Sequence, residues 1–258
     1  MHTDSSRAPL GALIAVGLVG GLLAGLFGVG GGIIMVPLLL WWARLDQRRA
    51  QATSLLAIAP AALIGMASYA VGQIFPLVPA LLLAFGAIGG AQVGALLLRT
   101  LSLPWLRWSF ALFVMAMAIA VIFTVPDRSA HLEINILNAL LLAVLGIVMG
   151  ITAGLFGVGG GILTIPFLMI IFGIGDLEAK AISLIAMAPA AISGSFSHVR
   201  NGTALLRDGA WVAVGAIIAT PVGALGAFSL PESYANIIFG CFAFAISLAL
   251  LFRAARMK

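Results

Sequence analysis

Strongly apolar stretches of about 20 residues recur along the whole chain, and they limit what it can fold into. An α-helix needs about that many apolar residues to cross a hydrocarbon layer of ~30 Å. Only 8% of the 258 residues are charged and 63% are hydrophobic, so most of the exterior must face lipid. The sequence predicts an all-α polytopic membrane protein and excludes an ordinary soluble enzyme. The expected crossings cover 50–71, 76–98, 104–125, 135–156, 179–199, 205–228 and 231–252.

The N-terminal apolar run is too long for one crossing. It extends from Pro9 to Ala43 without a charge, which as one helix would measure about 52 Å at 1.5 Å per residue. The segment Gly28-Val29-Gly30-Gly31-Gly32 lies inside it. Consecutive glycines permit positive φ and an unwound turn, so we expect a broken segment here, either re-entrant or double-pass.

The sequence repeats itself after 129 residues. LFGVGGGI at 26–33 recurs at 155–162, and QATSLLAIAPAA at 51–62 corresponds to KAISLIAMAPAA at 180–191. We therefore divide the single transmembrane domain into a first repeat, 1–129, and a second repeat, 130–258. Small residues every fourth position also recur in both halves, as expected where helices pack closely in lipid: Gly17, Gly21 and Gly25 with Gly146, Gly150 and Gly154, and Gly86, Gly90 and Gly94 with Gly215, Ala219 and Gly223.

Loop charges predict the orientation, because Lys and Arg accumulate in cytoplasmic loops. If each glycine-broken segment returns to the side from which it came, only Arg128 and Lys180 lie outside. Both termini are then cytoplasmic, and the two repeats have inverted topology, as in many secondary transporters. This topology accounts for the net charge of +5 without a nucleic-acid partner. The expected cytoplasmic cations are Arg7, Arg44, Arg48, Arg49, Arg99, Arg107, Arg200, Arg207, Arg253, Arg256 and Lys258.

The duplicated glycine motif indicates an anion site. It lacks the Gly-Lys-Ser/Thr of a phosphate-binding loop and the strand and acidic residue of a dinucleotide fingerprint. An unwound turn exposes backbone N–H groups at the start of the next helix, and these favour anions. Spacing from Trp41 and Trp42 predicts that the break lies near the membrane midplane. The candidate substrate-binding glycines are Gly30, Gly31, Gly32, Gly159, Gly160 and Gly161. The competing interpretation is a tight hairpin that only packs helices.

Few other polar groups accompany the glycines. Ser54, Ser183, Thr164 and Gln92 are further candidate ligands, although each hydroxyl is more readily satisfied by a carbonyl one turn back. Prolines can kink helices and permit gating; the candidates are Pro37, Pro166, Pro60 and Pro189.

We expect no charged side chain in the interior of the crossings, and hence an anion held by dipoles, amides and hydroxyls. No residue cluster suits a metal or a cofactor. Ser195, Ser197 and His198 do not have the spacing of a catalytic triad, so we do not expect an enzyme.

The repeated GLFGVGGG with a proline five residues on, followed by SLxAxAPAA, closely resembles the sulfite exporter TauE/SafE family, also called toluene-sulfonate uptake permeases. The resemblance covers nearly the whole chain. It implies a plasma-membrane transporter, of the bacterial inner-membrane type, for small sulfur-containing anions such as sulfite or organosulfonates, with export the expected direction. A membrane scaffold or assembly factor that transports nothing, and a passive anion channel, are the alternatives. The glycine-rich faces would suit a homodimer or a monomer interior equally well.

Overall fold

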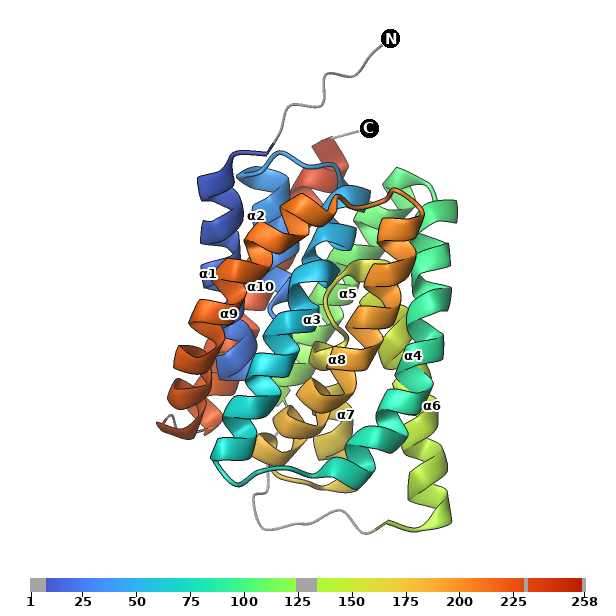
Figure 1. Ribbon diagram of the computed structural model, residues 1–258, viewed down its shortest axis with the longest axis vertical. Coiled ribbons are helices and arrows are strands. Elements are labelled where there is room, and N and C mark those ends of the chain that lie inside the picture. Colours follow the sequence, from blue (N-terminus) through green and yellow to red (C-terminus); the bar gives the residue numbers. More distant parts are fainter. Residues whose placement is uncertain (1–7, 124–133, 230–231, 257–258) are drawn as a thin grey trace.

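A computed structural model describes residues 8–123, 134–229 and 232–256, and in these ranges the chain is entirely α-helical, without strands (Figure 1). Ten helices succeed one another there with short connections. They are α1 (Leu10–Phe27), α2 (Gly32–Trp41), α3 (Gln47–Val71), α4 (Leu77–Thr100), α5 (Leu103–Phe123), α6 (Ile136–Phe156), α7 (Gly161–Phe172), α8 (Asp176–Arg200), α9 (Leu206–Ser229) and α10 (Glu232–Arg256).

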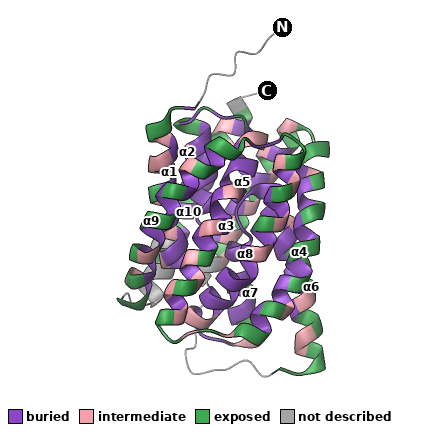
Figure 2. Ribbon diagram, viewed as in Figure 1, coloured by how far each residue is buried: buried purple, intermediate pink, exposed green. Residues whose placement is uncertain are grey.

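The helices have the lengths and surfaces of a membrane bundle. Seven are long and apolar enough to span a membrane, whereas α2 and α7 have only 10 and 12 residues. Large apolar side chains project outward, including Phe85 and Ile136, which are 82% and 83% exposed. Such side chains are stable outside only when they face hydrocarbon. Figure 2 shows this exposed exterior around a buried interior formed largely by α3, α7 and α8. The expected all-α multi-pass membrane fold is confirmed.

Four of the five pairs of corresponding helices in the two halves begin 129 residues apart. The pairs are Gly32 with Gly161, Gln47 with Asp176, Leu77 with Leu206, and Leu103 with Glu232. In Figure 1, α1 and α6 start at opposite ends of the bundle, and α3 runs in the direction opposite to α8. The start of α1 and the end of α10 lie at the same end. Among the expected loop and terminal charges, Arg7, Arg128 and Lys258 lie outside the described residues.

The closest helix packing joins one half to the other. Helix α1 packs along α9, and α4 packs along α6. A Cβ on Gly21 of α1 would overlap the backbone of Ala216 in α9, and one on Gly150 of α6 would overlap the backbone of Ala87 in α4. The expected role of these regularly spaced small residues, close approach of helices in lipid, is therefore confirmed.

The four candidate prolines lie within helices that continue past them. Pro37 is in α2 and Pro60 in α3, and their counterparts Pro166 and Pro189 are in α7 and α8. Each proline removes one backbone N–H from its helix. Their role in gating stays a prediction.

Candidate functional site

The glycine motifs form two interruptions of helical structure in the interior of the bundle. Helix α1 ends before Gly28, and α2 begins after Gly31, whose φ is 73°. In the second half, α6 ends before Gly157, and α7 begins after Gly160, whose φ is 79°. This left-handed conformation strongly favours glycine. No side chain caps the N-terminus of α2 or α7, so the first amides of both helices depend on other partners.

The two interruptions contact each other directly. A Cβ on Gly32 would overlap the backbone at Gly157 and Val158, and one on Gly161 would lie 2.8 Å from the carbonyl oxygen of Gly28. The start of each short helix therefore meets the motif of the opposite half. Both motifs lie in the middle part of the bundle along its long axis (Figure 1). All six candidate glycines thus belong to one region.

Two equivalent apolar residues contact both motifs. A Cβ on either Gly30 or Gly159 would meet the sulfur of Met187 and the Cγ2 of Ile58. Met187 lies in α8 and Ile58 in α3, at corresponding positions of the repeats, and both are fully buried. Helices α3 and α8 therefore contact the junction of the motifs through residues at equivalent positions in the two repeats.

The serines next to this junction lack hydrogen-bond partners. Ser54 and Ser183 are fully buried, and neither hydroxyl contacts a donor or acceptor among the described residues. The Ser183 oxygen would lie 2.8 Å from a Cβ on Gly161, so it lies against the start of α7. Gln51, one turn before Ser54, is also fully buried, and both polar atoms of its amide are unpartnered. Buried polar groups are nearly always paired, so this cluster has capacity for a polar ligand or water.

Two other candidate ligands are not available at the junction. The Thr164 hydroxyl donates to the carbonyl of Gly160, 3.1 Å away, as expected for a hydroxyl satisfied within its own helix. Gln92 is exposed on α4, and its amide donates to the backbone and hydroxyl oxygens of Ser193 at 2.8 and 2.7 Å. Gln92 therefore links α4 to α8 at the outside of the bundle, and we omit it from the site.

One charged residue near the junction was not expected. Helix α8 begins at Asp176, three residues before the expected crossing, and Lys180 lies within it with only 3% of its surface exposed. Its ammonium forms an ion pair with Asp176 at 2.9 Å. A Cβ on Gly28 would lie 2.7 Å from the Cβ and Cγ of Lys180. The expectation that the crossings have no charge in their interior is wrong at Lys180, whereas the side of the membrane on which Lys180 lies stays a prediction.

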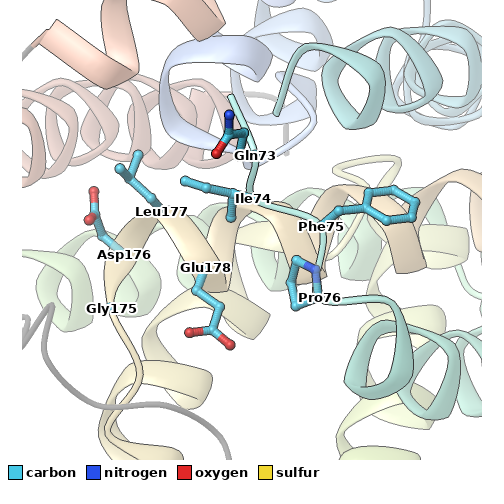
Figure 3. A pocket seen from close by; sticks show the side chains of 8 residues that line it. All are labelled: Gln73, Ile74, Phe75, Pro76, Gly175, Asp176, Leu177 and Glu178. Atoms are coloured by element: carbon cyan, nitrogen blue, oxygen red, sulfur yellow. The ribbon is translucent and has the colours of Figure 1, made fainter. Parts of the chain in front are cut away.

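A pocket lies at each end of the bundle, and the two are formed by corresponding segments. One encloses about 380 Å³ between the α3–α4 connection, residues 73–76, and the start of α8, residues 175–178 (Figure 3). The other, about 510 Å³, lies between the start of α3 and residues 201–203. The first contains Asp176 and Glu178, whose carboxylates point away from each other in Figure 3. The second is lined by the basic residues Arg48, Arg49 and Arg99, together with Asp46.

The arginines of the second pocket also support the fold. Arg48 donates to the carbonyl oxygens of Leu98 and Leu101 at 2.9 and 2.7 Å, at the C-terminal end of α4. Arg99 donates to the Asn201 side chain at 2.6 Å. A cation at a helix C-terminus is favourable because it opposes the negative end of the helix dipole.

The described residues contain no group of His, Cys, Asp and Glu that could hold a metal ion. His198 is buried and lies 3.0 Å from the Gly154 carbonyl oxygen through its Nε2 atom, so it links α8 to α6.

The arrangement defines a polytopic membrane protein in which each of two uncapped short helices meets the glycine motif of the opposite half in the interior. The family model for the sulfite exporter TauE/SafE matches residues 2–121 and 142–258. The chain therefore belongs to the TauE/SafE family and is a membrane transporter of that family, which confirms the resemblance noted in its motifs.

Curated relatives point to the same class. The chain is 26% identical over 213 residues to "Probable membrane transporter protein YunE" of Bacillus subtilis, an alignment that covers 74% of this chain and 78% of the relative. It is 28% identical over 247 residues to a "Probable membrane transporter protein" of Xylella fastidiosa strain Temecula1, covering 92% and 93% of the two chains. A protein of the same name from strain 9a5c is 35% identical over 111 residues, 42% of each chain. No solved structure matches the chain.

Proposed function

We propose that this protein transports a small sulfur-containing anion, such as sulfite or an organosulfonate, through a site at the junction of the two glycine motifs. The anion would be bound by the backbone amides of residues 30–32 and 159–161 and by the hydroxyls of Ser54 and Ser183. The family description names sulfite export, which supports both the substrate class and an outward direction.

The observation that carries the proposal is the contact of each uncapped helix start with the glycine motif of the opposite half, in a region that contains unpartnered buried hydroxyls. Each helix N-terminus has the effect of roughly half a positive charge. Two of them directed at one region can stabilise an anion without surrounding it with arginines. Such a site suits a transporter, because an anion bound by partial charges can also be released.

The two halves would move relative to each other to expose this junction alternately. We propose that they are inverted-topology repeats, and the opposite directions of α3 and α8 support this. The occupied centre of the junction, where Ile58 and Met187 contact both motifs, would have to open for the anion to pass. Pro60 and Pro189 lie inside α3 and α8, and bending of these helices at the prolines would allow such a movement.

We further propose a bacterial inner-membrane location with both termini in the cytoplasm. The pocket lined by Arg48, Arg49 and Arg99 lies at the end where α1 starts and α10 ends. An excess of Arg at that end supports its cytoplasmic assignment. Beyond the lipid bilayer and the substrate, a second copy of the chain is a candidate partner, and no nucleic acid is expected.

Flux of radioactive sulfite into proteoliposomes tests the function. A transporter should give flux that saturates with sulfite concentration and that is accelerated by sulfite on the opposite side. Flux without saturation or exchange would indicate a passive channel, and no flux of sulfite, thiosulfate or sulfonates would favour a scaffold. Replacement of Gly31 or Gly160 by Leu should abolish flux while the protein still inserts in the membrane.

A further inference from the structure

The buried ion pair of α8 lies between the pocket of Figure 3 and the glycine junction. Asp176 is 1% exposed and lines that pocket, and Lys180 follows it one helical turn further into the bundle. Ser183 lies one more turn along the same face, against Gly161. Residues spaced by three and four share one face of a helix. These three side chains therefore form a polar line from the pocket to the start of α7.

The first half has the same line without the charges. Gln47 and Gln51 of α3 occupy the positions of Asp176 and Lys180, and they are 4% and 0% exposed. The Nε2 atom of Gln47 and both polar atoms of the Gln51 amide are unpartnered. The backbone of Gln51 lies against Gly157 as the stem of Lys180 lies against Gly28. The fold thus accommodates a neutral pair at this place, so its packing does not require a Lys and an Asp.

We propose that Lys180 is a cationic ligand of the transported anion, and that Asp176 is the carboxylate that holds it when no anion is bound. A sulfur oxyanion on its way out of the cell would take the place of Asp176 at the Lys180 ammonium before it leaves through the pocket. The Asp176 carboxylate would then turn into the hydrated pocket. This inference rests on the proposed function. It adds a cationic ligand to the proposed site, and this ligand comes from the second half of the chain only.

Charge balance favours such an exchange. An ammonium buried without a counter-ion is strongly unfavourable, whereas one that is paired and hydrogen-bonded is tolerated. A sulfite or sulfonate oxygen can accept the same charge-assisted hydrogen bond as a carboxylate oxygen. The ammonium therefore keeps one anionic partner throughout, first Asp176 and then the substrate. Binding does not require the carboxylate and the substrate to be buried together.

Two variants of α8 should change sulfite binding in opposite directions. Asp176→Asn removes the competing carboxylate and leaves Lys180 in place, so sulfite should bind about tenfold more tightly, the scale of a charge-assisted hydrogen bond. The double variant Asp176→Gln with Lys180→Gln gives the second half the residues of the first, and sulfite should bind about tenfold or more weakly. Binding to the purified protein can be measured by titration calorimetry and by the sulfite-induced rise in Tm.

Glu178→Gln is the matched control, because it removes a negative charge from the same pocket and keeps both members of the Lys180–Asp176 ion pair. It should change the dissociation constant much less than Asp176→Asn. If the ion pair is purely structural, both α8 variants should have a lower Tm. Their affinity for sulfite would then be either unchanged or reduced in both, and either result would overturn the proposal. Saturable sulfite flux by the wild-type protein together with such a result would retain the proposed function. If the wild-type protein shows no flux but the two α8 variants change sulfite affinity in opposite directions, the binding site is retained and the transport function is rejected.

Discussion

The unpartnered serines at the junction lead to a specific prediction: their replacement should raise the stability of the protein and weaken transport. A buried hydroxyl without a partner costs about 1–3 kcal/mol. Ser54 and Ser183 are both fully buried and unpartnered, so Ser54→Ala or Ser183→Ala should stabilise the substrate-free protein by about 1 kcal/mol each. For a chain of this size the Tm should rise by roughly 2–4 °C per substitution.

The same substitutions should weaken transport. Each removes one hydrogen bond to the anion, which on the scale of bonds to charged groups corresponds to roughly 1.5–3 kcal/mol. The apparent KM for sulfite in proteoliposomes should therefore rise about tenfold or more. Tm would be followed by differential scanning calorimetry in detergent without sulfite.

Thr164→Val provides the comparison, because this hydroxyl already donates to Gly160. Its loss should lower the Tm or leave it unchanged, with little effect on KM. A lower Tm and an unchanged KM for both serine variants would show that their hydroxyls are structural, and the binding argument would fail.

Further predictions concern space at the junction, packing between the halves, and the outer amide. Gly161→Ala should sharply reduce flux, because its Cβ would lie 2.8 Å from the Ser183 hydroxyl. Gly89→Ala should leave flux unchanged, because a Cβ there has no atom within 4 Å. Flux assays with equal amounts of inserted protein compare the two variants. Gly150→Leu should lower the Tm by several degrees, since overpacking costs about 1–3 kcal/mol, and an unchanged melting curve would contradict the close packing of α6 on α4. Gln92→Leu should leave the KM for sulfite unchanged, and a rise in KM would return this residue to the site.

Sequence patterns were sufficient for the helices and for the interruptions. Hydrophobic length predicts the crossings to within a few residues, because the thickness of the membrane sets the length of a spanning helix. Consecutive glycines predict the breaks in α1–α2 and α6–α7, because only glycine adopts positive φ at low cost. The repeat made both predictions firmer, since each feature occurs twice.

The errors concern side-chain direction and burial, which depend on the packing of helices on one another. Gln92 lies two residues from both Gly90 and Gly94, whose spacing marks the packed face of α4, so that spacing already placed the amide away from the interior. The burial of Lys180 was not predicted, because a charge at the end of an apolar run usually lies in water. Its position three residues before Ser183 was the available signal, since residues three apart lie on one face of a helix and Ser183 was already a candidate ligand.

The pairing of α1 with α9 constrains how the protein is made. The glycines of α1 fit against a helix that is synthesised roughly 200 residues later, and at about 5–20 residues per second this interval lasts roughly 10–40 s. During that time the groove along α1 lacks α9, its neighbour in the folded protein. Lipid or the insertion machinery must therefore cover the groove until α9 arrives, and assembly of the first half can be completed only after most of the second half has left the ribosome.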